Sequence, residues 1–552
     1  MRKYLTLALS ASVLALAACG GGGGGSSSGG GGAVVTPPPP PPPPPATGNT
    51  FTPGVFEASS NFKNQCESPR VGPDANGETW PDVAGTASDE RFWLRSWSDE
   101  TYLWYDEITD QDPDNFDDKI AYFNTLVTQR TTPSGNNVDN FHGVADTEDY
   151  RRRQSGGPSV GYGWTVDLIQ STPPRQAVVA FTYGGSASAD LVERGAEILE
   201  IDGADLVNGN DVDTLNAGLF PQSAGETHTF KVRDADGTER EFTATTVEVE
   251  PPTVVESRIF DMDDGAGGTV KAAYLNFDSF SVRTAEKALY DAFQSYVDAG
   301  VEELFLDLRY NGGGFLNLSG QLAYMIAGDQ GNSTYYLTEF NGKTGNTDPV
   351  TGDTIRPTPF WSESLGFDPA SLPSGRPLPT LNLDSVSILS LGGTCSASEA
   401  VINGLRGVDV DVQLIGSTTC GKPFGFYPTD NCGTTYFTIQ FEGTNEKGFG
   451  DYADGFAPGE AVGNIGAVVP GCDASDDLSK ALGDPTESML STAIAYAETG
   501  ECPTTAVAEK PDVAPSAEVM LDDPAMDLRN DPRIALRTLL EQRAILPDES
   551  NR

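Results

Sequence analysis

The stretch DSVSILSLGGTCSASEAVINGLRG, from Asp384 to Gly407, contains a strand, a loop and a helix in direct succession. The first eight residues are typical of a short buried strand, and the glycines of GGTC indicate a loop. Ser396 and Glu399 have the spacing of a capping box, which predicts that the helix begins at Ser396. On this spacing alone, a helix cap is the better interpretation of Ser396 than a nucleophile.

The alternation of strands and helices continues on both sides of this unit, from residue 251 to residue 502. One helix is predicted between Thr284, which can cap it, and Gly300, which ends it; its apolar stripe includes Val297. Strands that alternate with helices predict an α/β fold with a parallel or mixed sheet. The shorter segments that support this pattern are KAAYLNFDSFS, VEELFLDL, LNLSGQLAYMIAG, DVDVQLIG and YFTIQF.

Three candidate site segments lie in loops that directly follow predicted strands: Gly312–Gly314, Ser396 and Lys422. In a parallel α/β sheet, the loops at the carboxyl ends of the strands share one edge, where binding sites form. We therefore expect the three segments to meet in one cleft.

A nucleophilic serine needs a base, and the whole chain holds two histidines, His142 and His228. Neither histidine lies in the α/β segment. Lys422 is the only charged residue between Val412 and Thr429, and an apolar environment lowers the pKa of a lysine. A neutral lysine amine accepts a serine proton, so Lys422 is the nearer candidate for the base. Two alternatives stay open: a lysine that merely extends from a loop to solvent, and a distant His142 that folds back to the serine.

Nucleotide and metal sites are not expected. Residues 416–422 fit the P-loop spacing G-x-x-x-x-G-K, but Pro423 stands where a Ser or Thr would hold Mg²⁺, so we regard the match as accidental. The chain has no C-x-x-C or H-x-x-x-H pair, which argues against zinc. Asp and Glu outnumber Lys and Arg by 80 to 34, for a net charge of −46, and such a chain repels nucleic acid. The acidity indicates a well-solvated surface, with a preference for basic substrates as the second interpretation.

The N-terminal residues predict export and lipidation. Residues 1–18 have a basic start and a short apolar run, and the sequence up to Cys19 resembles a bacterial lipobox. This resemblance implies cleavage before Cys19, lipidation of Cys19 and anchoring to a membrane. Residues 19–50 are rich in Gly, Ser and Pro and read as a tether. Gly20 follows the lipidated cysteine, which favours the outer over the inner membrane of a bacterial envelope, with the chain facing the periplasm or the exterior.

Six further cysteines follow Cys19, and an even number in an exported chain predicts disulfides. Six cysteines allow 15 pairings, so the sequence alone does not decide among them. The short loops Cys420–Cys432 and Cys472–Cys502 are our predicted pairs.

The remaining segments suggest three further regions. Residues 51–155 read as helical and aromatic-rich, with the aromatic side chains packed on a neighbouring element. Residues 156–250 alternate as short strands and resemble a PDZ domain, with a hairpin turn at Asp236 and Gly237. Residues 503–552 form a tail whose segment DPRIALRTLLEQRAIL is a helix candidate.

The loop Gly161-Tyr162-Gly163-Trp164 occupies the place of the PDZ loop whose N–H groups capture a C-terminal carboxylate. A tight entry into a strand, with no ligand, explains the same residues equally well.

TCSASEAVINGLRG followed by IGSTTCGKPFG, together with LFLDLRYNGGGF, resembles the tail-specific, or C-terminal processing, serine peptidases. The resemblance covers about Arg91 to Cys502. It implies a crotonase-like α/β core with a preceding or inserted PDZ-like module, no cofactor, and a polypeptide substrate held by its C-terminal tail. The roles that it implies are a nucleophile at Ser396, a general base at Lys422, and an oxyanion hole from the N–H groups of Gly313 or Gly314 with Ala397.

Two positions depart from the family pattern. Many members carry a glutamine four residues after the lysine, where this chain has Phe426, and an acid where it has Gly407. These departures keep open an alternative: a catalytically weak or inactive peptide-binding scaffold lipoprotein on the same fold. Cys395 could be considered as a nucleophile, but no histidine in this segment would activate it.

Overall fold

The computed structural model describes residues 49–74, 77–154, 159–459, 466–503 and 544–545, all within the compact unit Asn49–Arg552. The predicted signal peptide, Cys19 and the tether up to residue 48 lie outside the described residues. Among the described helices, none is long and apolar enough to cross a membrane.

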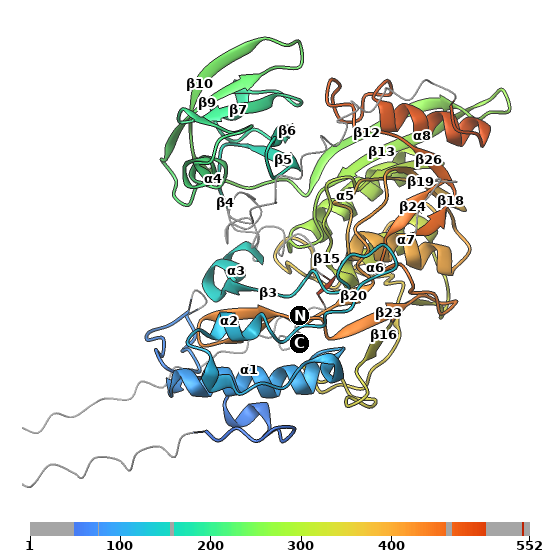
Figure 1. The fold of residues 1–552 in the computed structure, drawn as a ribbon. Coiled ribbons are helices and arrows are strands. Elements are labelled where there is room, and N and C mark those ends of the chain that lie inside the picture. The colour runs from blue at the N-terminus through green and yellow to red at the C-terminus, as the bar shows by residue number, and fades with distance from the viewer. Residues whose placement is uncertain (1–48, 75–76, 155–158, 460–465, 504–543, 546–552) are drawn as a thin grey trace, which may run out of the picture. The chain divides into compact units, whose positions relative to one another are not determined.

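A mixed six-stranded sheet forms the centre of the α/β segment, in the order β12-β13-β14-β18-β19-β26 (Figure 1). Strand β12 is antiparallel to β13, and all other neighbours are parallel. The predicted α/β alternation with a mixed sheet is therefore confirmed. The strands are β12 (Val254–Asp263), β13 (Thr269–Phe277), β14 (Glu303–Asp307), β18 (Ser385–Ser390), β19 (Asp411–Gly416) and β26 (Gly471–Asp473).

Helices cover both faces of this sheet. Successive side chains of a strand point to opposite sides, so the apolar side chains of one strand contribute to a core on each face. Ala273, Leu275 and Phe277 of β13 belong to the core under α5, α6 and α7. Ala272 and Tyr274 of the same strand pack with α8 instead. The helices are α5 (Ala285–Ala299), α6 (Leu316–Ala327), α7 (Ala397–Gly407) and α8 (Ser488–Thr499).

Helix α5 has the predicted limits. Gly300 ends it in a left-handed conformation (φ 71°), which glycine adopts without a steric penalty. The Thr284 side chain makes no capping hydrogen bond, and Val297 is 39% exposed rather than buried in the stripe.

A second sheet of four strands, in the order β17-β16-β23-β20, lies beside α7. The segment YFTIQF, expected to form one strand, divides between β22 and β23. Strand β22 pairs with β21 and with β3 from the N-terminal region. The short strands are β3 (Gly143–Asp146), β16 (Thr334–Phe340), β17 (Thr358–Pro359), β20 (Phe424–Gly425), β21 (Thr429–Asn431), β22 (Thr434–Phe437), β23 (Phe441–Thr444), β24 (Phe456–Pro458) and β25 (Ala467–Val469).

The N-terminal region is less helical than predicted. It contains α1 (Ala87–Thr101), α2 (Lys119–Phe123) and α3 (Thr147–Gln154), joined by single 3₁₀ turns and the short strands β1 (Gln65–Cys66) and β2 (Val83–Ala84). Its aromatic side chains do pack on a neighbouring element, as expected: Trp93 and Trp97 of α1 stack 4.9 Å apart, and Trp93 contacts Tyr436 of β22. The aromatic cluster is therefore structural.

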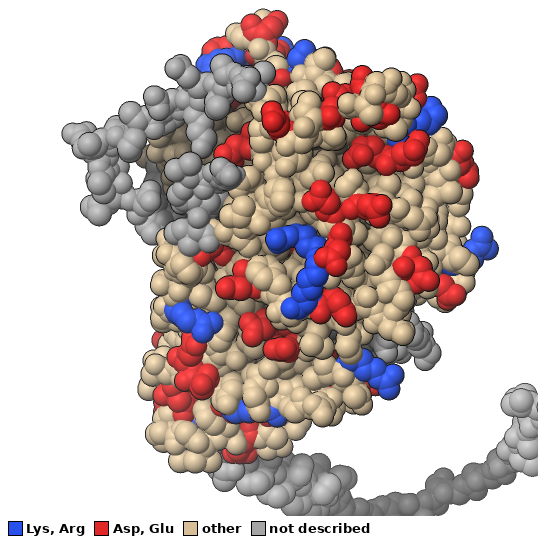
Figure 2. Space-filling model, turned by 90° about the vertical axis from the view of Figure 1, so that its right-hand side faces the viewer, with Lys and Arg blue, Asp and Glu red and all other residues tan. Residues whose placement is uncertain are grey.

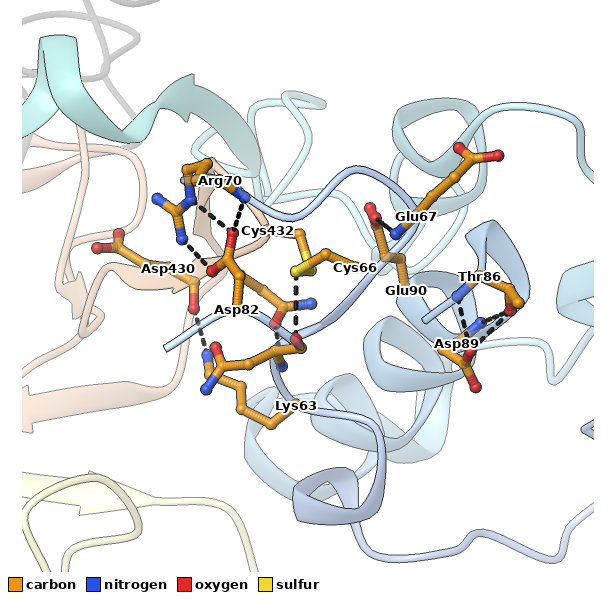
Figure 3. Close-up of a disulfide and its surroundings, with 12 residues drawn as sticks. Lys63, Cys66, Glu67, Arg70, Asp82, Thr86, Asp89, Glu90, Asp430 and Cys432 are labelled. Carbon is orange, nitrogen blue, oxygen red and sulfur yellow. Dashed lines mark hydrogen bonds and ion pairs between the residues drawn. A yellow bond between two sulfur atoms is a disulfide. The ribbon is translucent and has the colours of Figure 1, made fainter. Parts of the chain in front are cut away.

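A disulfide and several polar contacts tie this region to the turn between β21 and β22 (Figure 3). Cys66 is bonded to Cys432, and the Lys63 amine donates to the Asp430 carbonyl oxygen beside it. Close by, Arg70 forms an ion pair of 2.7 Å with the buried Asp82.

Residues 159–249 form a β-rich module with its own hydrophobic core. Its main sheet has the order β10-β9-β7-β6-β5, and the predicted hairpin at Asp236 and Gly237 joins β9 to β10. The segment GSASADLVERG contains one 3₁₀ turn, Ala189–Leu191. The elements are β4 (Ser159–Gly161), β5 (Trp164–Gln170), β6 (Gln176–Thr182), β7 (Glu197–Ile201), β8 (Ala204–Asp205), α4 (Val212–Leu219), β9 (Thr227–Arg233), β10 (Glu239–Thr245) and β11 (Val247–Val249).

All six cysteines after Cys19 form disulfides, and one of the two predicted pairs is correct. Cys472 is bonded to Cys502, as expected. Cys420 is bonded to Cys395, so the predicted pair Cys420–Cys432 is wrong. The reason is topological, because β18 and β19 are parallel neighbours. The loop after β18 carries Cys395, the loop after β19 carries Cys420, and the two loops begin side by side.

Most of the predicted C-terminal helix lies outside the described residues. Its two described residues, Ala544–Ile545, form strand β27, which contradicts a helix at these two positions. Strand β27 pairs in parallel with β15 (Gly314–Phe315).

The surface agrees with the strong acidity of the chain. On the face drawn in Figure 2, acidic side chains are dispersed among uncharged ones, and the few Lys and Arg side chains do not dominate the face. This distribution fits the interpretation of a solvated surface.

Candidate active site

The glycine loop after β14 lies directly against the turn that carries Ser396. A Cβ atom on Gly313 would be 2.8 Å from the Cys395 carbonyl oxygen, 2.9 Å from Ser396 Cβ and 3.0 Å from the Ala397 nitrogen. The Cys395 N–H and the Ser398 hydroxyl both donate to the carbonyl oxygen of Asn311. The loops after β14 and β18 therefore meet at one sheet edge.

The loop after β19 joins them. The Cys420 N–H donates to the Thr394 carbonyl oxygen over 3.0 Å, and Cys420 is bonded to Cys395. All three predicted segments are thus brought together, and Lys422 follows two residues after Cys420.

Ser396 occupies a strained position. Its backbone has φ 58° and ψ −111°, a region that residues with a side chain rarely adopt and that is common at functional sites. The residue is 2% exposed, and its Oγ has no hydrogen-bond partner among the described residues. An unpaired buried hydroxyl costs about 1–3 kcal/mol, which is unusual for a residue that serves only as a cap.

Glu399 links the serine turn to the lysine loop. One buried carboxylate accepts hydrogen bonds from both sides: from Ser396 N–H (2.9 Å), Thr419 Oγ1–H (2.6 Å), Gly421 N–H (2.8 Å) and Lys422 N–H (2.8 Å). Burial raises the pKa of Glu399 above its usual value, and these donors partly offset the shift. The sequence spacing predicted the hydrogen bond between Glu399 and Ser396. No sequence pattern predicted that Glu399 also binds a loop more than 20 residues away.

The Lys422 side chain is 2% exposed and lies between two aromatic rings. Its Nζ is 4.3 Å from the ring centre of Phe426 and 4.5 Å from that of Phe141. Aromatic faces attract an ammonium group. At the position where the family pattern has a glutamine, an aromatic ring therefore contacts the amine directly. The sequence analysis did not identify Phe141, which comes from the N-terminal region.

The predicted oxyanion-hole residues Gly313 and Ala397 are adjacent. Ala397 is the first residue of α7, so its N–H has no acceptor within the helix. The Gly313 N–H already donates to Asn311 Oδ1 over 2.9 Å. Gly314, the other glycine candidate, pairs with Ala544 of β27.

One group of potential metal ligands lies at this site among the described residues: Cys395, Glu399 and Cys420. The two sulfur atoms are bonded to each other, so neither offers the thiolate that a metal needs. The group is a disulfide beside a carboxylate.

His142 is engaged in the protein interior rather than free to act as a base. Its ring stacks on Phe123 at 3.8 Å, Nε2 lies 2.9 Å from the Phe123 carbonyl oxygen, and Nδ1 lies 3.1 Å from Thr438 Oγ1. Because a carbonyl oxygen only accepts, Nε2 carries the proton and Nδ1 accepts from the threonine. Burial lowers the pKa of His142, which keeps the ring neutral. The second histidine, His228, lies in β9 of the β-rich module and contacts Asp202.

We expect His142→Ala to leave kcat for peptide cleavage within about twofold and to lower stability by about 1–3 kcal/mol, since it removes two hydrogen bonds and a stacked ring. Steady-state kinetics and thermal unfolding of the same preparation measure both effects. A large loss of kcat without a change in stability would instead assign the base to His142.

The loop Gly161–Trp164 has a structural function. The Tyr162 and Trp164 rings are buried and stack at 4.7 Å, and the Tyr162 hydroxyl donates to the Gly218 carbonyl oxygen at the end of α4. Gly161 pairs with Val247 in the β4–β11 ladder. These contacts fit the tight strand entry, and any ligand contact from this loop would have to come from its backbone.

The match to a family model lies within the α/β segment. Residues 271–428, which include Ser396 and Lys422, match the family model described as Peptidase family S41. No curated protein matches the chain significantly.

Among solved structures, a putative S41 protease from Bacteroides fragilis NCTC 9343 is 23% identical, with a TM-score of 0.52 over 76% of this chain and 97% of that one. This likeness concerns the fold. The photosystem II D1 C-terminal processing protease is 17% identical, with a TM-score of 0.40 over 66% and 90% of the two chains. Residues 271–428 are therefore similar to peptidase family S41, and the fold is similar to that of a solved S41 protease.

Proposed function

We propose that the chain is a serine endopeptidase that cleaves exported polypeptides with Ser396 as nucleophile and Lys422 as general base. The observation that carries this proposal is the meeting of the two loops: a strained, buried serine with an unpaired hydroxyl adjoins a buried lysine loop, and Glu399 binds both. A helix cap alone requires neither the strain nor the buried lysine.

The reaction follows from these positions. Ser396 Oγ attacks the peptide carbonyl carbon while the neutral Lys422 amine takes its proton. The negative charge that develops on the carbonyl oxygen is stabilised by the N–H groups of Gly314 and Ala397. Lys422 then returns the proton to the leaving amine, an acyl-enzyme forms, and water hydrolyses it with the same base.

An extended polypeptide fits the edge beside this site. Strand β27, from the C-terminal tail of the chain itself, pairs in parallel with Gly314–Phe315 and contacts β20 next to Lys422. Added strands are a common mode of peptide binding, because the backbone provides the affinity. A substrate bound in the same way would have its backbone next to the proposed oxyanion hole.

We further propose that the module of residues 156–250 recognises substrate tails in the manner of a PDZ domain. Strand β5 ends the sheet order of this module, and Ile169 on it is 52% exposed. An edge strand with an exposed apolar side chain suits an apolar C-terminal segment. The predicted lipidation at Cys19 and the location in a bacterial envelope belong to the same proposal, and the three disulfides support an oxidising compartment.

A cleavage assay with a tail-swapped substrate tests this function. The full chain is incubated with one unfolded protein carrying either an apolar or a Lys-rich C-terminal tail, and Ser396→Ala is the control. We expect cleavage of both substrates by the wild type, a lower KM for the apolar tail, and no cleavage by the variant. Equal absence of cleavage by both chains, with tail binding retained, would favour the scaffold alternative.

A further inference from the structure

One disulfide joins the two loops of the proposed catalytic pair. Cys395 immediately precedes Ser396, Cys420 lies two residues before Lys422, and the two cysteine Cα atoms are 5.2 Å apart. The other two disulfides are in different places, at the β21–β22 turn and between β26 and the residue stretch after α8.

Hydrogen bonds also hold the backbone of the lysine loop. The N–H groups of Gly421 and Lys422 donate to Glu399, so the backbone of the loop is fixed. The rings of Phe141 and Phe426 lie on either side of the amine, 4.5 Å and 4.3 Å from Nζ. The side-chain amide that orients the lysine in the family pattern is absent here.

We propose that the Cys395–Cys420 disulfide positions Lys422 for proton transfer from Ser396, so that the peptidase is fully active only while this bond is oxidised. The inference rests on the proposed function, because it concerns the same catalytic pair. The disulfide fixes the distance between the two loops one residue before the serine and two residues before the lysine. Cys420 Sγ also lies 3.3 Å from Glu399, the carboxylate that binds both loops.

Reduction by a dithiol would release this constraint. A reductant thiolate attacks the sulfur of Cys420, the less buried of the two residues, and the electron pair of the S–S bond leaves with the sulfur of Cys395, which takes a proton. The second thiol of the reductant then closes its own disulfide and frees Cys420 as a thiol. The reductant is oxidised, and the two loops are held by hydrogen bonds alone.

The chain provides a matched control for this disulfide. The pairs Cys395–Cys420 and Cys472–Cys502 are separated by 25 and 30 residues, so their removal has nearly the same effect on the entropy of the unfolded chain. We expect the double alanine variants of both pairs to lose similar amounts of Tm. The variant of Cys395–Cys420 should lose kcat by about 10–100-fold with KM within about twofold, and the control should keep both constants within about twofold.

Hydrogen exchange gives a readout that does not depend on catalysis. The amides of Gly421 and Lys422 should exchange about tenfold faster or more in the Cys395→Ala/Cys420→Ala variant and remain protected in the control. If the variant fails to fold, dithiothreitol titration of the wild type replaces it, with activity restored on reoxidation.

The outcomes separate the two proposals. A wild type that cleaves no peptide overturns the proposed function, while the exchange measurement still decides the positioning. An active wild type whose kcat and amide exchange survive loss of the Cys395–Cys420 bond overturns the inference alone.

Discussion

Replacing Lys422 with alanine is expected to lower kcat for peptide cleavage by roughly 10²–10⁴-fold, the usual contribution of a general base. The effect should be this large because Glu399 and the Cys395–Cys420 disulfide both join the Lys422 loop to the Ser396 turn. KM should change little, since the lysine acts on the serine rather than on the bound peptide. Steady-state kinetics on an unfolded protein substrate measure both constants.

Lys447 provides the control for this variant. It is a surface lysine in the turn after β23, paired with Asp409 and about half exposed. Lys447→Ala should leave kcat within about twofold, because exposed ion pairs contribute little. Equal losses in the two variants, or full activity of Lys422→Ala, would show that Lys422 is not the base.

Gly313→Ala is expected to lower kcat by about 100-fold with little change in the secondary structure. The new methyl group would lie within 3.0 Å of the Cys395 carbonyl oxygen, of Ser396 Cβ and of the Ala397 nitrogen, so the serine turn must shift. The residue also has φ 107°, which is unfavourable for alanine.

Gly267→Ala is the control that distinguishes the effect of steric crowding from that of backbone strain. Gly267 also has a positive φ, of 90°, but a Cβ there would meet no atom within 4 Å. Gly267→Ala should therefore lower stability slightly and leave kcat unchanged. If Gly313→Ala keeps normal kcat, the glycine loop does not press against the catalytic turn in solution.

The sequence predicted the elements that follow from short-range patterns and from the order of strands and helices. The strand–loop–helix unit of residues 384–407, the end of α5 at Gly300 and the meeting of three loops all follow from alternation and topology. The same reasoning explains why Cys420 was paired wrongly: proximity along the chain favoured Cys432, whereas the parallel register of β18 and β19 brings Cys395 closer.

The contacts that hold the lysine were not predictable from local patterns. Glu399 was identified as a helix cap, but its second role requires a loop more than 20 residues downstream. Phe141 reaches the amine from the N-terminal region across the fold. At position 426, where the family pattern has a glutamine, the Phe426 ring lies 4.3 Å from the Lys422 amine.

The most direct test of this account is the position of a covalent adduct on the chain. A fluorophosphonate probe reacts with activated serines, and mass spectrometry of the digested protein identifies the modified residue. We expect an adduct on Ser396 in the wild type, none on Ser398, and at least about a 100-fold slower reaction in Lys422→Ala. An adduct on another residue, or equally fast labelling of Ser396 without Lys422, would contradict it.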